Sequence, residues 1–381
     1  MIKKSLVVMF VLLLTVSTAL VAGGQQDAAD SGSNVAAQPL DVNVDGSAVI
    51  LSTGPNGETA TNAATLSLTA DEVAQVQKMN ASAAVVFHYA GNDWSSAQLA
   101  GLKATFASLN IDVVAVTDAQ FKAEKQVADI ETVMALSPDI IVSIPTDPVA
   151  TSPAYKRAAD SGVKIVFMDN VAANMTQGKD YVSVVSADNY GNGVAAADIM
   201  AEELGGSGDV GVIFLDADFF VTNQRVEAFK ATIASTYPGI NIVESSGFAD
   251  PNKVSEVADA MLTLHPDIDG IFAVWDGPAE AVVGSAKVIG RDDLVITTID
   301  LGNNAGRIIA EKGLIKGLGA QLPYDQGVSE AILAAYALLG KEAPPYVAVP
   351  ALRVDHSNIL EAFKQVYSMD APAIVQNAYV D

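Results

Sequence analysis

Residues 83–88 read Ala-Ala-Val-Val-Phe-His, a nearly continuous hydrophobic run that is followed by the polar segment Asn92-Asp93-Trp94. Such a run is typical of a β-strand that is buried on both faces of a sheet. Segments with apolar residues at helical spacing separate it from later runs of the same kind, at 111–116, 139–144, 164–169, 182–187, 210–215, 240–244, 270–275, 294–300 and 314–321. This alternation predicts parallel sheets that are covered by helices and joined by right-handed crossovers.

Two sheets explain the length of this pattern. The halves 83–187 and 210–321 each hold about five strand–helix units, which is the size of one open, doubly wound lobe. We therefore predict an α/β protein with two doubly wound parallel-sheet lobes. Length alone leaves a single (β/α)₈ barrel as the alternative.

Composition excludes several classes of function. The chain has 381 residues, 50% of them hydrophobic, and 45 acidic residues against 21 basic ones give a formal charge of −24. Nucleic-acid binding is excluded, because phosphate affinity comes from clustered lysine and arginine. The chain has no cysteine, which excludes disulfides, thiolate metal sites and cysteine nucleophiles. We expect no metal and no cofactor, and we interpret the acidic excess as a solvated surface.

The first residues indicate export. Lys3 and Lys4 precede an apolar run at 6–14 and a small-residue stretch at 17–24. This order predicts a secretory signal peptide over residues 1–23, with an uncleaved anchor helix as the alternative. Position 24 is glycine, so no thiol is available for lipid attachment, and we expect a protein that is released into the periplasm.

Residues 24–82 are interpreted as a leader. Asp41-Val42-Asn43-Val44-Asp45-Gly46 begins like a calcium loop, but Ser52 stands where such a loop needs a glutamate. A hairpin between 40–44 and 48–51, with its turn at Asp45-Gly46, explains the same residues. A short helix is expected within 66–78, with Thr69 as its N-cap and Glu72 completing a capping box.

Isolated polar and aromatic residues follow the predicted strands. In open parallel sheets, ligands bind outside the carboxyl ends of the strands, where such side chains leave the core and face a crevice. The residues at these ends are Asn92, Trp94, Asp169, Asn170, Trp275, Asp276, Asp300 and Gln321.

Together these segments resemble one family, the periplasmic sugar-binding proteins of the ribose-binding type, which are the solute receptors of ABC importers. The resemblance covers 83–354 and rests on seven segments that occur in the family's order: Asn92-Asp93-Trp94, Ile144-Pro145-Thr146-Asp147, Phe167-Met168-Asp169-Asn170, Ser186-Ala187-Asp188-Asn189, Leu262-Thr263-Leu264-His265-Pro266-Asp267, Thr298-Ile299-Asp300 and Ala320-Gln321-Leu322-Pro323. It implies two lobes that close on a ligand at a hinge of three crossovers, near Ala187, Leu322 and 343–346. The N-terminal lobe would then hold 83–187 plus 322–343, and the C-terminal lobe 188–321 plus 344–381.

The resemblance also implies a function. The protein would be a monomeric receptor, not an enzyme, that captures a sugar or polyol and delivers it to an ABC permease. Carried over position by position, the ligand-binding residues are Asn92, Trp94, Asp169, Asn170, Arg225, Phe248, Trp275, Asp276, Asp300 and Gln321. An indole face would bury the C–H face of a sugar, and the planar polar groups would bind its hydroxyls.

Three positions depart from the family pattern. Ser95 replaces the second of two adjacent aromatic residues, Asn170 stands where an arginine is usual, and Trp275 replaces an asparagine. Fewer donors and more aromatic surface predict a ligand other than ribose.

Other interpretations of single residues stay open at this point. Asp169 and Asp300 could be helix N-caps, Arg225 a solvated surface residue and Trp275 a core residue, whereas His88 and His265 are expected to be structural.

Three other functions compete with the receptor. Gly191-Asn192-Gly193 with Asp216 is close to a dinucleotide-binding fingerprint. A transcription regulator would carry an N-terminal helix-turn-helix, where this chain has a signal peptide. A secreted sugar-processing enzyme could use the two cleft aspartates as acid and base, although pairing with Arg225 would keep both ionised.

Overall fold

Two large β-sheets organise the chain in the computed structural model, which describes residues 37–381. The predicted signal peptide at 1–23 and the first part of the predicted leader lie outside the described residues. Residues 37–381 form one compact unit. Within it, no helix is long and apolar enough to cross a membrane.

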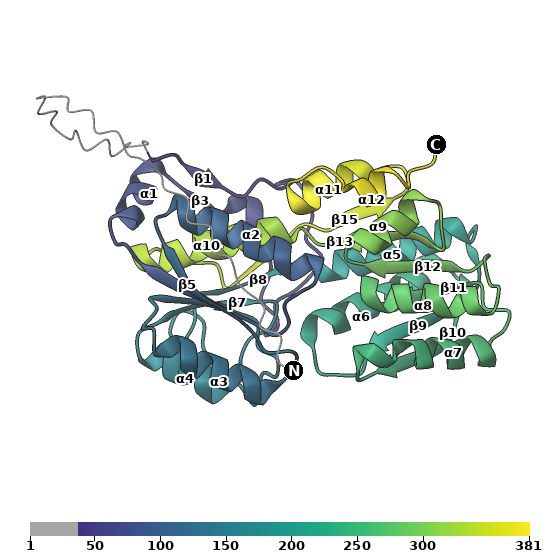
Figure 1. The fold of residues 1–381 in the computed structure, drawn as a ribbon, viewed down its shortest axis with the longest axis horizontal. Coiled ribbons are helices and arrows are strands. Elements are labelled where there is room, and N and C mark those ends of the chain that lie inside the picture. The colour runs from purple at the N-terminus through teal and green to yellow at the C-terminus, as the bar shows by residue number, and fades with distance from the viewer. Residues whose placement is uncertain (1–36) are drawn as a thin grey trace, which may run out of the picture. The chain divides into compact units, whose positions relative to one another are not determined.

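The first sheet has seven strands in the order β2-β14-β8-β7-β6-β4-β5, and all neighbouring pairs are parallel. Its strands are β2 (Thr61–Asn62), β4 (Ser82–Phe87), β5 (Asp112–Asp118), β6 (Ile140–Ser143), β7 (Lys164–Met168), β8 (Ser183–Ala187) and β14 (Tyr346–Val349). One face is covered by α2 (Asp93–Ser108) and α10 (Pro323–Leu339), and the other by α3 (Ala123–Met134) and α4 (Ser152–Asp160) (Figure 1). We call this sheet with its helices the first lobe.

The second sheet has six strands in the order β10-β9-β11-β12-β13-β15. Only β15 runs antiparallel to its neighbour. The strands are β9 (Ser207–Leu215), β10 (Gly239–Phe248), β11 (Gly270–Ala273), β12 (Val295–Ile299), β13 (Ile315–Ala320) and β15 (Leu352–Asp355). Its helices are α5 (Asn189–Glu203), α6 (Phe220–Thr236), α7 (Val254–Leu264), α8 (Asp276–Val288), α9 (Asn303–Ala310), α11 (Ile359–Tyr367) and α12 (Ala373–Gln376). We call this the second lobe.

Burial on both faces explains the continuous hydrophobic runs. In β11, Phe272 packs into the core beneath α5 and α6, whereas its neighbours Ile271 and Ala273 pack into the core beneath α7 and α8. All three side chains are fully buried. The prediction of two doubly wound parallel-sheet lobes is confirmed, and the single barrel is wrong.

Three crossovers join the lobes, at 187–189, 320–323 and 349–352. The first two lie where they are expected, but the third is displaced. The resemblance places it at 343–346, with 344–381 in the second lobe, whereas β14 (Tyr346–Val349) belongs to the first sheet. The reason is that Tyr346–Val349 is a fully buried run, which pairs with β8 on one side and β2 on the other.

Residues 37–82 are part of the first lobe rather than a separate leader. The predicted short helix is α1 (Ala70–Gln77), and the capping box between Thr69 and Glu72 is confirmed. The predicted hairpin is wrong, because β1 (Leu40–Asp41) pairs with β3 (Ser67–Leu68) and not with 48–51. Leu68 is buried in the core whereas Val49 is 79% exposed, which explains the choice of partner. Across the described residues, no group of three or more His, Asp or Glu side chains is placed to hold a metal ion, so the calcium-loop interpretation of 41–46 has no support.

One stretch of this N-terminal segment reaches the hinge. The carboxylate of Asp188, in the first crossover, accepts hydrogen bonds from the backbone N–H groups of Leu51 (3.0 Å) and Ser52 (2.9 Å) and from the Ser52 hydroxyl (2.8 Å). On the second lobe, Gln224 Nε2 of α6 donates to the carbonyl of Thr53 at 2.9 Å. We call residues 51–53 the strap, because they hydrogen-bond to the crossover and to the second lobe.

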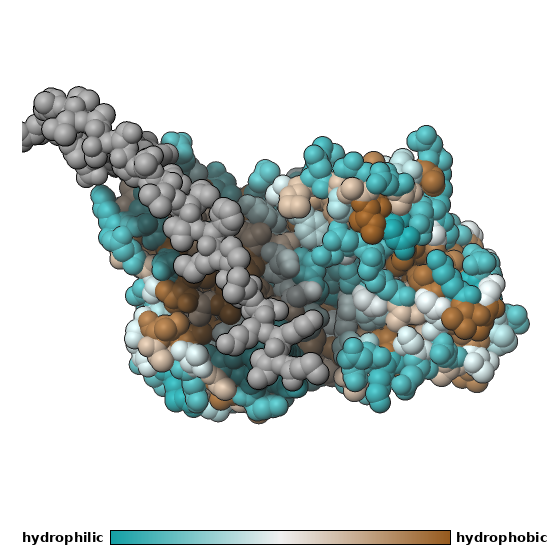
Figure 2. Space-filling model, viewed as in Figure 1, coloured by the Kyte–Doolittle hydropathy of each residue, from teal (hydrophilic) through white to brown (hydrophobic). Residues whose placement is uncertain are grey.

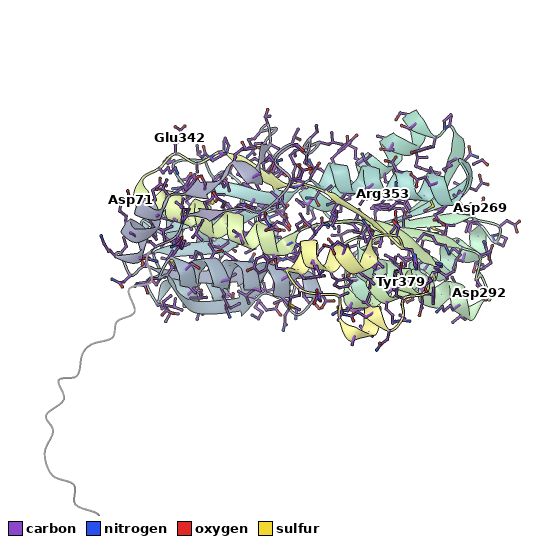
Figure 3. The ribbon with its side chains drawn as sticks, turned by 90° about the horizontal axis from the view of Figure 1, so that it is seen from above. Asp71, Asp269, Asp292, Glu342, Arg353 and Tyr379 are labelled. Carbon is purple, nitrogen blue, oxygen red and sulfur yellow. The ribbon has the colours of Figure 1, made fainter. Side chains whose placement is uncertain are left out.

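On the face that Figure 2 shows, hydrophilic side chains predominate over the coloured part of the surface, with hydrophobic side chains scattered between them. Acidic and basic side chains project from the outside of both lobes, as Asp71 and Asp269 do in Figure 3. This agrees with the interpretation of the acidic excess as a solvated surface.

Candidate functional site

A cavity of about 740 Å³ lies at the carboxyl ends of the strands of both sheets. The first lobe contributes the residues that follow β4, β5, β6 and β7, and the second lobe those that follow β9, β10, β11 and β12. Gln321, in the second crossover, lines it as well. This is the position where open parallel sheets bind ligands.

Asp169 and Asp300 end strands β7 and β12 with a left-handed backbone. Their φ angles are 53° and 71°, a region that aspartate adopts more readily than most residues. No helix follows Asp169 before β8, and the cap of α9 is Gly302, so neither carboxylate is used as an N-cap. Both carboxylates line the cavity instead.

A chain of hydrogen bonds connects these two aspartates through the hinge. Asp169 Oδ1 accepts from the Ser186 hydroxyl at 2.6 Å, and Ser186 Oγ accepts from Asn189 Nδ2 at 2.9 Å. Asn189 Oδ1 then accepts from Arg225 Nε at 2.8 Å. Asn189 is the last residue of the first crossover and the first residue of α5, and it is fully buried, so this chain of hydrogen bonds passes through the hinge itself.

The other end of this chain lies in the second lobe. Arg225 Nη1 donates to Asp300 Oδ2 at 3.2 Å and to the Val274 carbonyl at 3.3 Å. Asp300 Oδ1 accepts from Gln321 Nε2 at 2.7 Å. Asp300 therefore contacts a cation of its own lobe and an amide of the second crossover.

Two indole rings line the cavity from opposite lobes. Trp94 lies at the start of α2 and is 9% exposed, and Trp275 caps α8 and is partly buried. Within the described part of the chain, the ring nitrogen of Trp94 has no hydrogen-bond partner. The Phe248 ring packs edge-on against Trp275, with ring centroids 5.2 Å apart.

The structure brings most of the predicted site residues together. Those that line the cavity are Asn92, Trp94, Asp169, Arg225, Trp275, Asp276, Asp300 and Gln321. Asn170 and Phe248 do not line it. Asn170 is 2% exposed behind Asp169, and the ring of Phe248 supports that of Trp275 from the core side. Arg225 is buried rather than solvated, and Trp275 is at the cavity wall rather than in the core.

Several aromatic residues of the wall were not predicted. His88, expected to be structural, lines the cavity together with Phe121, Phe219 and Tyr367. The imidazole of His88 stacks on Phe219 of the second lobe, with ring centroids 5.7 Å apart, so it contributes to contact between the lobes. His88 directly follows a buried strand, and that signal is the same one that identified the other strand-end residues.

A second contact between the lobes lies beside the cavity. Asp93 Oδ2, in the first turn of α2, accepts from the backbone N–H of Asn303 at 2.8 Å. Asn303 is the first residue of α9, so a carboxylate of the first lobe lies at the N-terminus of a helix of the second lobe. This hydrogen bond therefore joins the two lobes beside the cavity.

The carboxylates of the cavity differ in their electrostatics. Burial raises the pKa of Asp169 to about 6, which the Ser186 hydroxyl and Arg225 only partly offset. Burial and the nearby charge of Asp300 raise the pKa of Asp276 well above its usual value. The direct ionic partner of Arg225 is Asp300, and hydrogen bonds connect Arg225 to Asp169 through Asn189 and Ser186. Burial also lowers the pKa of His88 to about 4.

The glycines of the dinucleotide-like segment have packing roles. A Cβ on Gly193 would lie 2.4 Å from the Arg225 carbonyl oxygen, so the glycine lets α5 approach α6. A Cβ on Gly191 would lie 2.4 Å from Asp188 Oδ2, the carboxylate that caps α5. Close helix packing and a cap thus explain both glycines.

Comparison with known proteins agrees with this geometry. The family model described as "Periplasmic binding protein domain" matches residues 83–343. The chain belongs to this family. As a periplasmic binding protein, it shares the two-lobed fold and the cleft between strand ends that the resemblance implied, so that resemblance is confirmed.

Ribose import binding proteins are among the relatives of this periplasmic binding protein. The one from Salmonella typhimurium is 26% identical over 227 residues, which are 60% of this chain and 75% of that protein. The one from Bacillus subtilis is 32% identical over 183 residues, or 48% of this chain and 58% of that protein.

Solved structures show the same fold. AraP, an arabinose-binding protein from Geobacillus stearothermophilus, is 23% identical with a TM-score of 0.66, over 73% of this chain and 98% of that one. An ABC transporter solute-binding protein from Agrobacterium vitis, bound with α-D-tagatopyranose, is 23% identical with a TM-score of 0.67, over 79% and 99%. The periplasmic binding protein described here extends beyond the family model at its N-terminal end, where residues 37–82 complete the first lobe.

Proposed function

We propose that this protein is an extracytoplasmic solute-binding receptor, which captures a sugar or polyol between its lobes and delivers it to an ABC importer. The observation that carries the proposal is the cavity itself, where two indole rings from opposite lobes face carboxylate, amide and guanidinium groups. Indole faces bind the apolar face of a sugar, and the polar groups bind its rim. The names of the ribose-binding and arabinose-binding relatives support the same ligand class.

The hinge provides the mechanism. Open and closed states interconvert, and a ligand that contacts both lobes favours the closed state by its differential affinity. Trp94 of the first lobe and Trp275 of the second would hold opposite sides of the ligand. The closed form, as a monomer, is what the permease would then recognise. Export by the predicted signal peptide would place it on the correct side of the membrane.

Intrinsic fluorescence tests this proposal, because Trp94 and Trp275 are the two tryptophans of the chain. We expect a pentose, hexose or polyol to change the emission of the wild-type protein. Trp94→Phe and Trp275→Phe should each remove part of the signal and weaken binding, measured in parallel by calorimetry. Tyr237→Phe is a matched aromatic control, since Tyr237 lies in the second lobe outside the cavity. A complete panel without binding would contradict the proposal.

A secreted sugar-processing enzyme remains the second candidate. The observation that favours it is the pKa of Asp169, which burial raises to about 6, the range of a general acid. Incubation of the protein with each sugar that binds, followed by chromatography, decides between the two. A receptor returns the sugar unchanged, whereas a product that is lost in Asp169→Asn would establish the enzyme.

A further inference from the structure

The cavity holds an excess of carboxylates over cations. Asp93, Asp169, Asp276 and Asp300 line its interior, with Asp250 exposed at the rim. The basic residues that line it are Arg225, which is 4% exposed, and Lys122, which is exposed at the rim. His88 adds no positive charge at neutral pH, because burial lowers its pKa to about 4.

The buried guanidinium that lines the cavity already pairs with groups of the protein. Arg225 donates to Asn189, to the carbonyl of Val274 and to Asp300. Its charge therefore compensates Asp300. Within residues 37–381, no lysine or arginine forms a salt bridge with Asp93, Asp169 or Asp276. Three carboxylates of the site thus lack a cationic partner.

Some hydrogen-bond acceptors of the cavity have no donor from the described residues, which also indicates a ligand that carries donors. Gln321 lines the cavity and is 3% exposed, and its buried Oε1 has no hydrogen-bond partner within residues 37–381. Its orientation is fixed, because Nε2 of the same amide donates to Asp300. Asp276 Oδ1 accepts from the adjacent Gly277 N–H at 2.8 Å, and Asp276 Oδ2 accepts no hydrogen bond within residues 37–381. The site therefore needs a ligand that is rich in donors.

We propose that the ligand carries a protonated amine, as an amino sugar or an amino polyol does, and that Asp276 and Asp169 bind the ammonium group with Gln321. This inference rests on the proposed function. An ammonium group has three donors, no acceptor and one positive charge, and so matches the unused acceptors. The indole faces of Trp94 and Trp275 also attract a cation.

Titration with matched pairs of ligands tests whether the protein binds an amino ligand more tightly than the neutral ligand that carries a hydroxyl group instead. The pairs are D-glucitol with 1-amino-1-deoxy-D-glucitol, D-glucose with D-glucosamine, and D-galactose with D-galactosamine, each titrated by calorimetry. We expect at least one amino member to bind about tenfold or more tightly than its hydroxyl partner, since one unpaired buried charge is worth that much. A neutral member that binds as well as its amino partner in every pair overturns the amine and leaves the proposed function standing. No binding in any pair overturns both.

The pH dependence supplies an independent readout. Asp276 faces Asp93, Glu280, Asp300 and Tyr367, and Asp169 faces Ser186, Arg225, Asp300, Glu330 and Tyr346. Burial raises the pKa of Asp169 to about 6, so this carboxyl group gains a proton as the pH falls toward about 5. An alkylamine such as aminoglucitol stays protonated over this range. Its affinity should therefore rise from about pH 5 to about pH 7.5, and an affinity that falls over this interval contradicts the proposal.

Variants assign the binding to these carboxylates. Asp276→Asn keeps the shape of the side chain and removes its charge, so we expect roughly a thirty-fold loss for the amino ligand and a much smaller change for its neutral partner. Asp292→Asn is the control for net charge, because Asp292 is exposed at the outer end of the second lobe (Figure 3). An equal loss for both members of a pair in Asp276→Asn would show a shape effect and overturn the charge assignment.

Discussion

Arg225 Nη1 lies 3.2 Å from Asp300 Oδ2. Both side chains are largely shielded from solvent, since 5% of the Arg225 side chain and 15% of the Asp300 side chain are exposed. The same guanidinium donates to Asn189 in the first crossover, and Asp300 accepts from Gln321 in the second. This ion pair of the second lobe thereby connects two of the three crossovers to the wall of the cavity. The same side chains therefore take part in the hinge and in the candidate ligand site.

Replacement of Arg225 should therefore destabilise the protein. Arg225→Met leaves Asp300 buried without its cation, and we expect a fall of about 3–5 kcal/mol in the free energy of unfolding, measured by urea denaturation. The double variant Arg225→Met/Asp300→Leu should recover much of that loss, because no uncompensated charge remains. If Arg225→Met is as stable as the wild-type protein, the ion pair does not contribute to stability.

The strap offers a test of the hinge. Asp188 caps α5 through Gly191 and also accepts three hydrogen bonds from Leu51 and Ser52. Asp188→Ala should lower the free energy of unfolding by about 2 kcal/mol or more, since it removes a cap and leaves buried donors unsatisfied. Asp147→Ala is the matched control: Asp147 accepts from two backbone N–H groups in an exposed turn, without contact to the hinge. Equal effects of the two variants would argue against a special role of the strap.

Close packing of α2 on α10 depends on glycine. A Cβ on Gly101 would lie 2.1 Å from the carbonyl oxygen of Tyr324, a backbone atom that cannot move aside. Gly101→Ala should therefore destabilise the protein by about 1–3 kcal/mol. Gly284→Ala, in α8, meets no atom within 4 Å and should raise stability by up to about 1 kcal/mol through helix propensity. Thermal unfolding of both variants measures these opposite changes in stability.

The stability of the ligand-free protein should depend on pH through Asp325. Burial raises the pKa of Asp325 to about 7, whereas the unfolded value is 3.8. The folded state therefore binds the Asp325 proton more tightly than the unfolded state does. The resulting contribution to stability is complete below the pKa of the unfolded state, and it is lost as the pH rises through the pKa of the folded state. Asp325→Asn should raise the unfolding midpoint at about pH 8 and have little effect below about pH 4. An increase of the same size at both pH values would contradict the assignment.

The strand-end rule accounts for what the sequence predicted well. Asp169, Asp300 and Gln321 were identifiable because each follows a buried run, and the carboxyl ends of parallel strands meet at one edge. His88 satisfies the same rule, but its apolar surroundings along the chain favoured a structural role. Phe121 and Phe219 lie in loops after β5 and β9, where no local pattern indicates that the two lobes meet.

The errors concern pairing between distant segments. Both Tyr346–Val349 and the run at 48–51 are short apolar stretches, and their sequences do not tell which strand they will meet. Tyr346–Val349 joined the first sheet because a vacant position existed between β8 and β2. Asp45-Gly46 has the composition of a hairpin turn, but burial of Leu68 opposite Leu40 decided the pairing.

The strands β14 and β15 stand next to each other in the chain but complete different sheets. Until residues 346–355 have been synthesised, β8 and β13 both present unpaired edges, the kind of surface on which strands of other chains can add. Neither lobe can therefore finish folding before the other has nearly all of its sequence. The two lobes should unfold in a single cooperative transition despite their separate cores, because one short stretch near the end of the chain closes both.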